Sequence, residues 1–515
     1  MSIKKSQTDD VEKRFDEEAN LLFGQIYEYN YKLMKKSEDY DLEGNYNFID
    51  IFDFYITSHA LSLIKNMYHG YWGSLGMLQS VRCIFEGLSI KRMFQGGDIS
   101  EENTDLLQVQ EFLIEYRYYS KFTDILGLIL DPEKLAKDYE EACEVYRSKL
   151  NAKYTTQEIK DIIKSNIPFL CNPKISHRSL IQKYLGEEYG TIYGLCSQVI
   201  HPSENDSYQK SEYLDFVMLT YELIANEYSR LPIAKTTLRS HTLMSMSSDI
   251  SKELYQIIGT EAKIIEGIAK VFSQFFDNNY VSNTLRTISL LEQEMMFDRL
   301  TGFSEQVKVK WKLMLELLSV FHYEYVIQGL CEERYSLLLE HQSIQALRNC
   351  NKHYDLTHAY EIYRQLYPQG CEKEKFEKAI IQLTGYTIDE NGTVMTLTNM
   401  VDQFIRKFSP GDERNIFEQG MKIDYVESQM MSHANGYMWF ANSGAWMDTN
   451  NIFQASDASL LFVLNEVQMV FQVHQSAEET SKYKSIINAL RNGQKRIAIL
   501  MQRKMSLIQI PGTKI

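Results

Sequence analysis

The sequence predicts an all-α protein, and three observations lead to this prediction. Only 25 Gly and 8 Pro occur among 515 residues, whereas sheets need frequent turns that depend on such residues. Apolar residues recur with the 3.6-residue period of amphipathic helices. The chain is also too long for one ordinary core. Long helices arranged in two or more bundles are therefore expected.

The first domain is predicted to cover residues 1–231. A helix is expected at about 11–40, and a long apolar stretch from Phe48 to Phe94 reads as two helices divided near His69–Gly73. Further helices are expected at about 102–130, 132–150, 155–164, 178–200 and 211–230. A Ser/Thr-rich connector at 232–249 begins at Leu231-Pro232 and marks the domain boundary.

The second domain is predicted to cover residues 250–478, with a basic C-terminal helix and tail at 479–515. Its helices are expected at about 250–278, 281–298, 304–330, 332–348, 355–367, 373–384, 412–431, 456–475 and 479–504. One short β-hairpin is predicted near 386–397, because an Asn391-Gly392 turn lies between β-prone flanks.

Three correspondences indicate that the two domains are tandem, diverged copies of one helical-bundle unit. The segment Phe85-Glu86-Gly-Leu-Ser-Ile90 matches Leu339-Glu340-His-Gln-Ser-Ile344, and a tyrosine precedes a histidine by the same interval in each half. The helix after each histidine has the same apolar template. The matched residues are Glu86 with Glu340, Tyr193 with Tyr425, and His201 with His433.

Charge and cysteine usage limit the class of protein. The net charge of −15 opposes non-specific attraction to nucleic acid or to an anionic membrane. Seven cysteines occur without a CxxC pair, which is typical of reduced cytoplasmic thiols. The N-terminus lacks an apolar signal region, and no apolar run reaches transmembrane length. A cytoplasmic location without membrane contact is expected.

No cofactor or metal is expected from sequence motifs. We find no P-loop, GxGxxG, GxSxG or ExxH pattern. Cys350, His353 and His358 lack a fourth ligand at zinc spacing.

Two polar clefts are candidates for binding or chemistry. Arg82 and Glu86 lie at i, i+4 beside an apolar stripe, where they can pair, and His201 could join them from its own helix. Two interpretations remain open, a structural network that fixes helix register or a ligand cleft. His201 precedes Pro202 and could equally cap a helix end. The first cleft comprises Arg82, Glu86, Tyr193 and His201, and the second comprises Glu340, Tyr425 and His433.

The first half resembles an uncharacterised bacterial helical domain family over roughly residues 50–230. The resemblance lies in Ser80-Val-Arg82-Cys-Ile-Phe-Glu86 and in Tyr193-Gly-Leu-Cys-Ser-Gln-Val-Ile-His201-Pro202. That family implies no established chemistry.

A second resemblance concerns Arg348-Asn349-Cys350-Asn351-Lys352-His353. It is similar to the RNx(3)H motif of HEPN-type helical ribonucleases, found among abortive-infection proteins. The resemblance implies that Arg348, Asn349 and His353 act on an RNA phosphate without metal, with His353 in acid–base transfer. Neither half has an arginine at the matching distance before His201 or His433, so a paired active site would require a homodimer.

The C-terminal segment reverses the charge of the rest of the chain, because no acidic residue occurs from Thr480 to Ile515. This helix either packs on the acidic body or binds RNA or an acidic protein. Its candidate binding residues are Lys482, Lys484, Arg491, Lys495, Arg496, Arg503 and Lys504.

The sequence leaves two functions open. One is an antiviral, abortive-infection effector that acts as a metal-independent endoribonuclease. The other is a non-catalytic helical scaffold or sensor that binds a ligand or protein partner.

Overall fold

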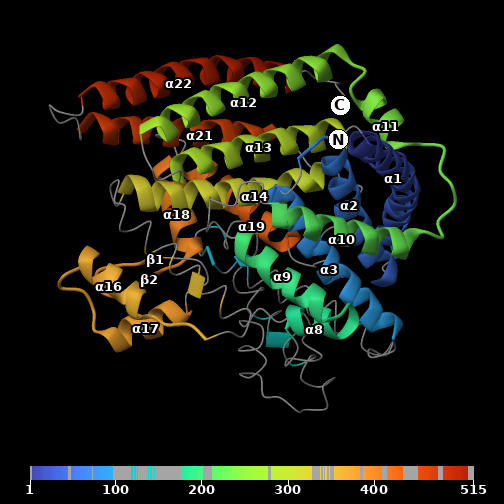
Figure 1. Cartoon of the computed structure of the whole chain (residues 1–515), viewed down its shortest axis with the longest axis horizontal. Helices are drawn as coiled ribbons and strands as arrows, with labels where there is room; N and C mark the ends of the chain where they lie inside the picture. The colour runs from blue at the N-terminus through green and yellow to red at the C-terminus, as the bar shows by residue number, and fades with distance from the viewer. Residues whose placement is uncertain are drawn as a thin grey trace.

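The computed structural model describes most of the predicted helices. It covers residues 3–43, 48–71, 74–96, 176–200, 211–275, 280–327, 353–382, 387–408, 414–432, 450–473 and 480–508, with isolated positions at 118–144 and 337–347. Nearly all of these residues are helical (Figure 1), so the predicted all-α class is confirmed.

In the fully described stretches of the first half, three long helices precede three shorter ones. They are α1 (Ile3–Glu43), α2 (Phe48–Tyr68), α3 (Leu75–Gln95), α8 (His177–Tyr184), α9 (Glu187–Ile200) and α10 (Ser211–Tyr228). The predicted break between α2 and α3 is present. The single helix predicted at 178–200 is instead two helices, because Gly186 between them adopts a φ of 124°, which no α-helix accommodates.

The second half begins with α12 (Asp249–Phe275), α13 (Tyr280–Leu300) and α14 (Ser304–Phe321), and a π-helical turn, η3 (His322–Ile327), extends α14. The later elements are α16 (Thr357–Leu366), α17 (Lys373–Gln382), β1 (Thr387–Ile388), β2 (Val394–Met395), α18 (Leu397–Phe408), α19 (Arg414–Met431), α21 (Asn450–Val473) and α22 (Thr480–Ile508). The predicted hairpin is present, with β1 and β2 antiparallel. Helix α18 was not predicted, although Met400, Val401, Phe404 and Ile405 form its buried side.

The two halves have the same element order and the same neighbours. Helix α3 packs against α2, α8, α9 and α10, and α14 packs against α13, α18, α19 and α21. In each half a long segment separates the third helix from the next of these neighbours, at 96–176 in the first half and 322–396 in the second. The two segments are of similar length, so the described neighbours recur at similar intervals in the two halves.

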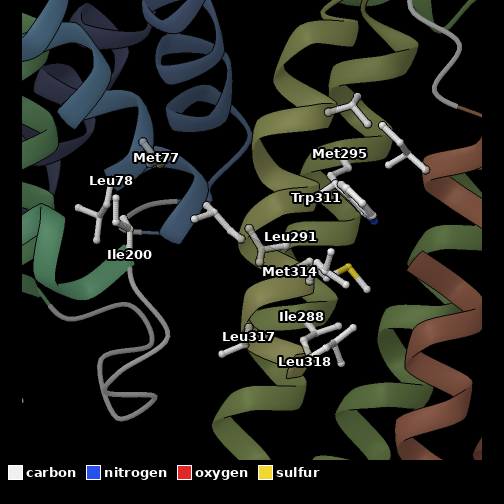
Figure 2. Packing of buried hydrophobic residues seen from close by; sticks show 14 of the residues in the cluster. Met77, Leu78, Ile200, Ile288, Leu291, Met295, Trp311, Met314, Leu317 and Leu318 are labelled. Atoms are coloured by element: carbon white, nitrogen blue, oxygen red, sulfur yellow. The ribbon is translucent and has the colours of Figure 1, made fainter. Parts of the chain in front are cut away.

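One continuous hydrophobic core runs through both halves. It contains Met77 and Leu78 of α3, Leu291 and Met295 of α13, and Trp311 of α14. Figure 2 shows part of this core, with Met77 and Leu78 on the side of the first half and Leu291, Met295 and Trp311 on the side of the second half. A second, small cluster is formed by α16, α17 and β1, which lie together at one corner of the molecule (Figure 1). The two predicted bundles therefore share one hydrophobic core, and the cluster of α16, α17 and β1 packs separately from it.

A buried network of four charges joins the halves between α2, α13 and α14. The Lys310 ammonium lies 2.5 Å from an Asp298 oxygen and 3.2 Å from a Glu294 oxygen, and Lys65 also pairs with Asp298. All four side chains are at most 1% exposed. The network balances two positive charges against two negative ones, as a dry interior requires.

The predicted connector is an ordered part of the fold. It contains a helix, α11 (Leu238–Ser245), which begins with a Thr237–Ser240 capping box. The backbone amides of Lys235 and Thr236 donate hydrogen bonds to Glu28 of α1, at 2.9 and 3.4 Å. The connector therefore runs against α1, which the Ser/Thr-rich composition did not predict.

Among the described helices, none combines the length and apolar character needed to cross a membrane.

The close approach of the connector to α1 depends on Gly24. A Cβ atom at this position would lie 1.8 Å from the Thr236 carbonyl oxygen, whereas nothing lies within 4 Å of the equivalent point at Gly267 in α12. We predict that Gly24→Ala lowers the free energy of unfolding by about 1–3 kcal/mol, because the backbone must shift. The control Gly267→Ala should be neutral or stabilising by about 0.5–1 kcal/mol. Urea denaturation measures both, and equal effects of the two variants would refute the close contact.

Candidate functional site

The first predicted cleft is a buried hydrogen-bonded triad on α3 and α9. Arg82 Nε donates to Glu86 Oε1 at 3.0 Å, and the Tyr193 hydroxyl donates to the same oxygen at 2.8 Å. The guanidinium also lies over the Tyr193 ring, 5.7 Å from its centroid. Glu86 is fully buried and Arg82 is 4% exposed. The structure therefore brings together three of the four predicted residues, while His201 lies outside the described residues.

The electrostatics of this triad keep the Arg82 guanidinium charged and the Tyr193 hydroxyl neutral. Burial would lower the pKa of Arg82, but Tyr193 and Glu86 outweigh it, so that this pKa is raised. Burial, and then Glu86, raises the pKa of Tyr193, which remains a neutral donor. Burial lowers the pKa of His177, a residue that the sequence did not single out, at the start of α8. Its ring lies 6.4 Å from that of Tyr193.

The second half contains an equivalent triad, but with a different carboxylate from the predicted one. The Tyr425 hydroxyl of α19 donates to Glu316 Oε1 of α14 at 3.0 Å. Lys312, one turn earlier on α14, lies 3.4 Å from the other Glu316 oxygen. The counterparts of Arg82, Glu86 and Tyr193 are thus Lys312, Glu316 and Tyr425. His433, the predicted third member, lies outside the described residues.

Glu340 is not part of this second triad, so its predicted match with Glu86 is wrong. The Glu340 carboxylate oxygen Oε1 lies 2.7 Å from His358 Nδ1, within hydrogen-bond distance, and the Glu340 side chain is 31% exposed. Its neighbours Leu337 and Ile344 belong to the small cluster with α16 and α17. A short Glu-x-x-Ser-Ile pattern recurs by chance, whereas the sequence of Lys312-x3-Glu316 does not match that of Arg82-x3-Glu86, because it has Lys in place of Arg.

Of the three predicted ribonuclease residues, the structure describes only His353. This side chain is exposed in the non-helical stretch before α16. Nearby, Asp355 accepts hydrogen bonds from the Thr357 backbone amide at 3.0 Å and hydroxyl at 2.8 Å, and these bonds lower the pKa of its carboxyl group. Arg348 and Asn349 lie outside the described residues.

The basic C-terminal helix is an integral part of the second bundle. Helix α22 packs along α12 and α21 (Figure 1) and buries Ile486, Leu490 and Ile497 in the main core. Most of its predicted binding residues face outward, while Lys482 is half-buried. Arg503 Nε forms an ion pair with Glu253 of α12 at 2.7 Å. The exposed basic residues are Lys484, Arg491, Lys495, Arg496 and Arg503.

Lys504 is not available to a partner, so its predicted role in RNA or partner binding is wrong. It is fully buried, and its ammonium lies 3.0 Å from Glu261 and 2.5 Å from Asp457. It lies on the core side of α22, on the same side as Ile497. The composition identified a basic helix, but it could not show that Lys504 is buried while most of the other basic residues are exposed.

Glu261, Glu292 and Asp457 form a carboxylate cluster around Lys504 that the sequence did not predict. Burial raises the pKa of Glu261 to about 7 and that of Glu292 well above its ordinary value. The three carboxylates come from α12, α13 and α21, so no sequence spacing could have shown that they meet.

Comparison with protein-family models, with curated proteins and with solved structures found no match for this chain.

The described candidate residues divide into two kinds by exposure. The two triads and the Lys504 cluster are closed inside the core, where they hold helices together and are shielded from large substrates. His353 and the outer side of α22 are accessible to a partner.

Loss of the tyrosine hydroxyl should destabilise each of the two triads. Tyr193→Phe and Tyr425→Phe each remove a donor to a buried carboxylate, so each should lower the free energy of unfolding by about 1.5–3 kcal/mol. Tyr255→Phe, at a 46% exposed position on α12, should change it by less than about 0.5 kcal/mol. Chemical denaturation provides the comparison. If Glu340→Gln proved as costly as Glu316→Gln, the assignment of the second triad would be wrong.

Proposed function

We propose that this chain is a cytoplasmic defence-type protein, of the bacterial abortive-infection kind, that acts as a helical scaffold and binds RNA through the outer side of α22. The observation that carries this proposal is the separation of charge on that helix. Its inner side is used in packing, and its outer side carries five exposed cations without an acidic residue anywhere from 480 to 508.

The arrangement of these cations fits an extended polyanion. Lys484, Arg491 and Lys495 lie at i, i+7 and i+11, so a helix places them on one side. From Lys484 to Arg503 the cations extend over about 28 Å along the helix axis, at 1.5 Å per residue. In a protein of net charge −15, attraction of phosphates must be local, and this surface supplies it.

The closed triads favour a scaffold over an enzyme built on the predicted clefts. Each buries an ionic pair whose carboxylate also accepts a tyrosine hydroxyl, which fixes α3 against α9 and α14 against α19. Such networks specify how helices pack. Rigid packing of the second bundle in turn holds α22 in place for a partner.

Neutralising the outer side of α22 should weaken RNA binding. For the triple variant Lys484→Gln, Arg491→Gln, Lys495→Gln we predict at least a tenfold loss of affinity for a labelled single-stranded RNA, measured by fluorescence anisotropy. The dependence of log K on log salt should flatten by about 2, because about 0.7 counterion is released per phosphate contact.

A control triple removes the same charge from α12. Lys252→Gln, Lys263→Gln and Lys270→Gln alter exposed lysines, two of which pair with acidic neighbours on their own helix. This control should retain both the affinity and the salt slope. Equal losses in the two triples would leave only non-specific charge attraction. Binding of polyglutamate in place of RNA would assign the surface to an acidic protein partner.

A metal-independent ribonuclease is the second candidate, and the exposure of His353 favours it. An imidazole that is accessible to solvent can reach an RNA phosphate and move a proton near neutral pH. In this proposal Arg348 and Asn349 hold the phosphate, and a homodimer supplies a paired site.

The ribonuclease proposal predicts cleavage of RNA in EDTA. His353→Ala should abolish cleavage and leave the melting temperature nearly unchanged, because the exposed ring contributes little to packing. His358→Ala, at another exposed histidine five positions later, is the matched control and should retain activity. Gel analysis of labelled RNA decides the matter. Intact RNA with the wild-type chain, or cleavage that survives His353→Ala, removes this candidate.

A further inference from the structure

Three carboxylates meet inside the bundle formed by α12, α13, α21 and α22. Glu261, Glu292 and Asp457 each bring one oxygen atom within 4.8 Å of the other two. Each side chain comes from a different helix, and each residue is at most 3% exposed. Lys504 approaches the group from the fourth helix, α22.

The charges of this cluster do not balance. Three carboxylates face one ammonium, and among the described residues Lys504 is the one cation that acts on both Glu261 and Glu292. An excess of two negative charges would remain in the interior if every group were ionised. Buried charge without compensation is very costly, so the excess must be neutralised, either by a bound cation or by protons on the carboxylates.

The pattern of contacts shows where such a cation can bind. Lys504 contacts Glu261 Oε2 and Asp457 Oδ1. The remaining oxygens, Glu261 Oε1 and Asp457 Oδ2, are buried without a hydrogen-bond partner in the described structure, as is Glu292 Oε1. One buried acceptor thus remains on each of the three carboxylates, while the Lys504 ammonium contacts the other oxygen of Glu261 and of Asp457.

We propose that these three carboxylates bind a divalent cation of the oxygen-preferring class, with Ca²⁺ first and Mg²⁺ or Mn²⁺ as alternatives. Two oxygens on opposite sides of Ca²⁺ lie about 4.6–5.2 Å apart, and those around Mg²⁺ about 4.0–4.2 Å apart. One oxygen from each of the three carboxylates lies within 4.8 Å of the other two, so a single ion can contact all three. With the ion bound, three negative charges are balanced by two from the metal and one from Lys504.

Lys504 has a positioning role in this site. Its bonds to Glu261 and Asp457 orient their carboxylates, as outer partners of metal ligands do. The cation would join two pairs of consecutive helices, α12 with α13 and α21 with α22, which lie far apart in the sequence. Through Lys504 it would also fix α22 against the other three helices. This inference does not rest on RNA binding, since the cluster is on the buried side of the helix.

The test uses the full chain, stripped of metal by dialysis against EDTA. Isothermal titration with Ca²⁺, Mg²⁺ and Mn²⁺ should show one ion bound per chain, and bound ion should raise the melting temperature. Glu292→Gln keeps the side-chain volume and removes one ligand charge, so it should lower the affinity at least tenfold. Glu316→Gln, at an equally buried glutamate outside the cluster, should leave the affinity unchanged.

Two results would overturn the proposal. One is the absence of heat and of any melting shift with all three ions at millimolar concentration. The other is unaltered affinity in Glu292→Gln. If Glu292→Gln also raised the melting temperature in EDTA while the wild-type chain bound no ion, protons would be the compensating charge. Should Glu292→Gln fail to fold, Glu261→Gln supplies the same comparison from α12.

Discussion

The buried charge network between α2, α13 and α14 is the constraint on which the rest of the structure depends. Hydrophobic burial is non-directional, and an apolar contact between the halves would allow many relative orientations. Ion pairs among fully buried groups allow few, because removal of one partner leaves an uncompensated charge at a cost of about 3–5 kcal/mol. Gly76 of α3 contributes by its lack of a side chain, since a Cβ there would lie 2.1 Å from a Glu294 oxygen. The four charges are those of Lys65, Glu294, Asp298 and Lys310.

The two halves share the same arrangement of three buried polar side chains, but the residues that form it differ. Both retain a buried glutamate that binds a cation one turn earlier and a tyrosine from a later helix. The cation differs, and so does its chemistry, because a guanidinium can stack on the tyrosine ring whereas an ammonium is a compact point charge. In the second half Gln429 donates to the Tyr425 hydroxyl at 2.7 Å and accepts from Lys121 of the first half at 3.2 Å. The second triad has thereby become part of the contact between the halves.

Helix α22 takes part in both proposals, although the three proposed cation ligands lie on α12, α13 and α21. Its outer side is basic and exposed, and its inner side contributes Lys504 to the carboxylate cluster. The two proposals nonetheless concern opposite sides of the helix and different chemistry. Phosphate attraction depends on exposed cations and on salt, whereas the cation site depends on buried carboxylates. Each can therefore fail without the other.

The sequence by itself determined the features that are local in the chain. Helical periodicity predicted most helices, the Asn391-Gly392 turn predicted the hairpin, and the interval before each histidine identified Tyr193 and Tyr425 as equivalents. The basic character of α22 was equally plain from composition. Tertiary structure alone decided which carboxylate each tyrosine meets, and it placed Glu316 where the sequence had suggested Glu340. It also decided that Lys504 lies inside, among acids from three other helices. These contacts depend on how helices that are far apart in the sequence pack together, and such packing produces no fixed spacing between the contacting residues.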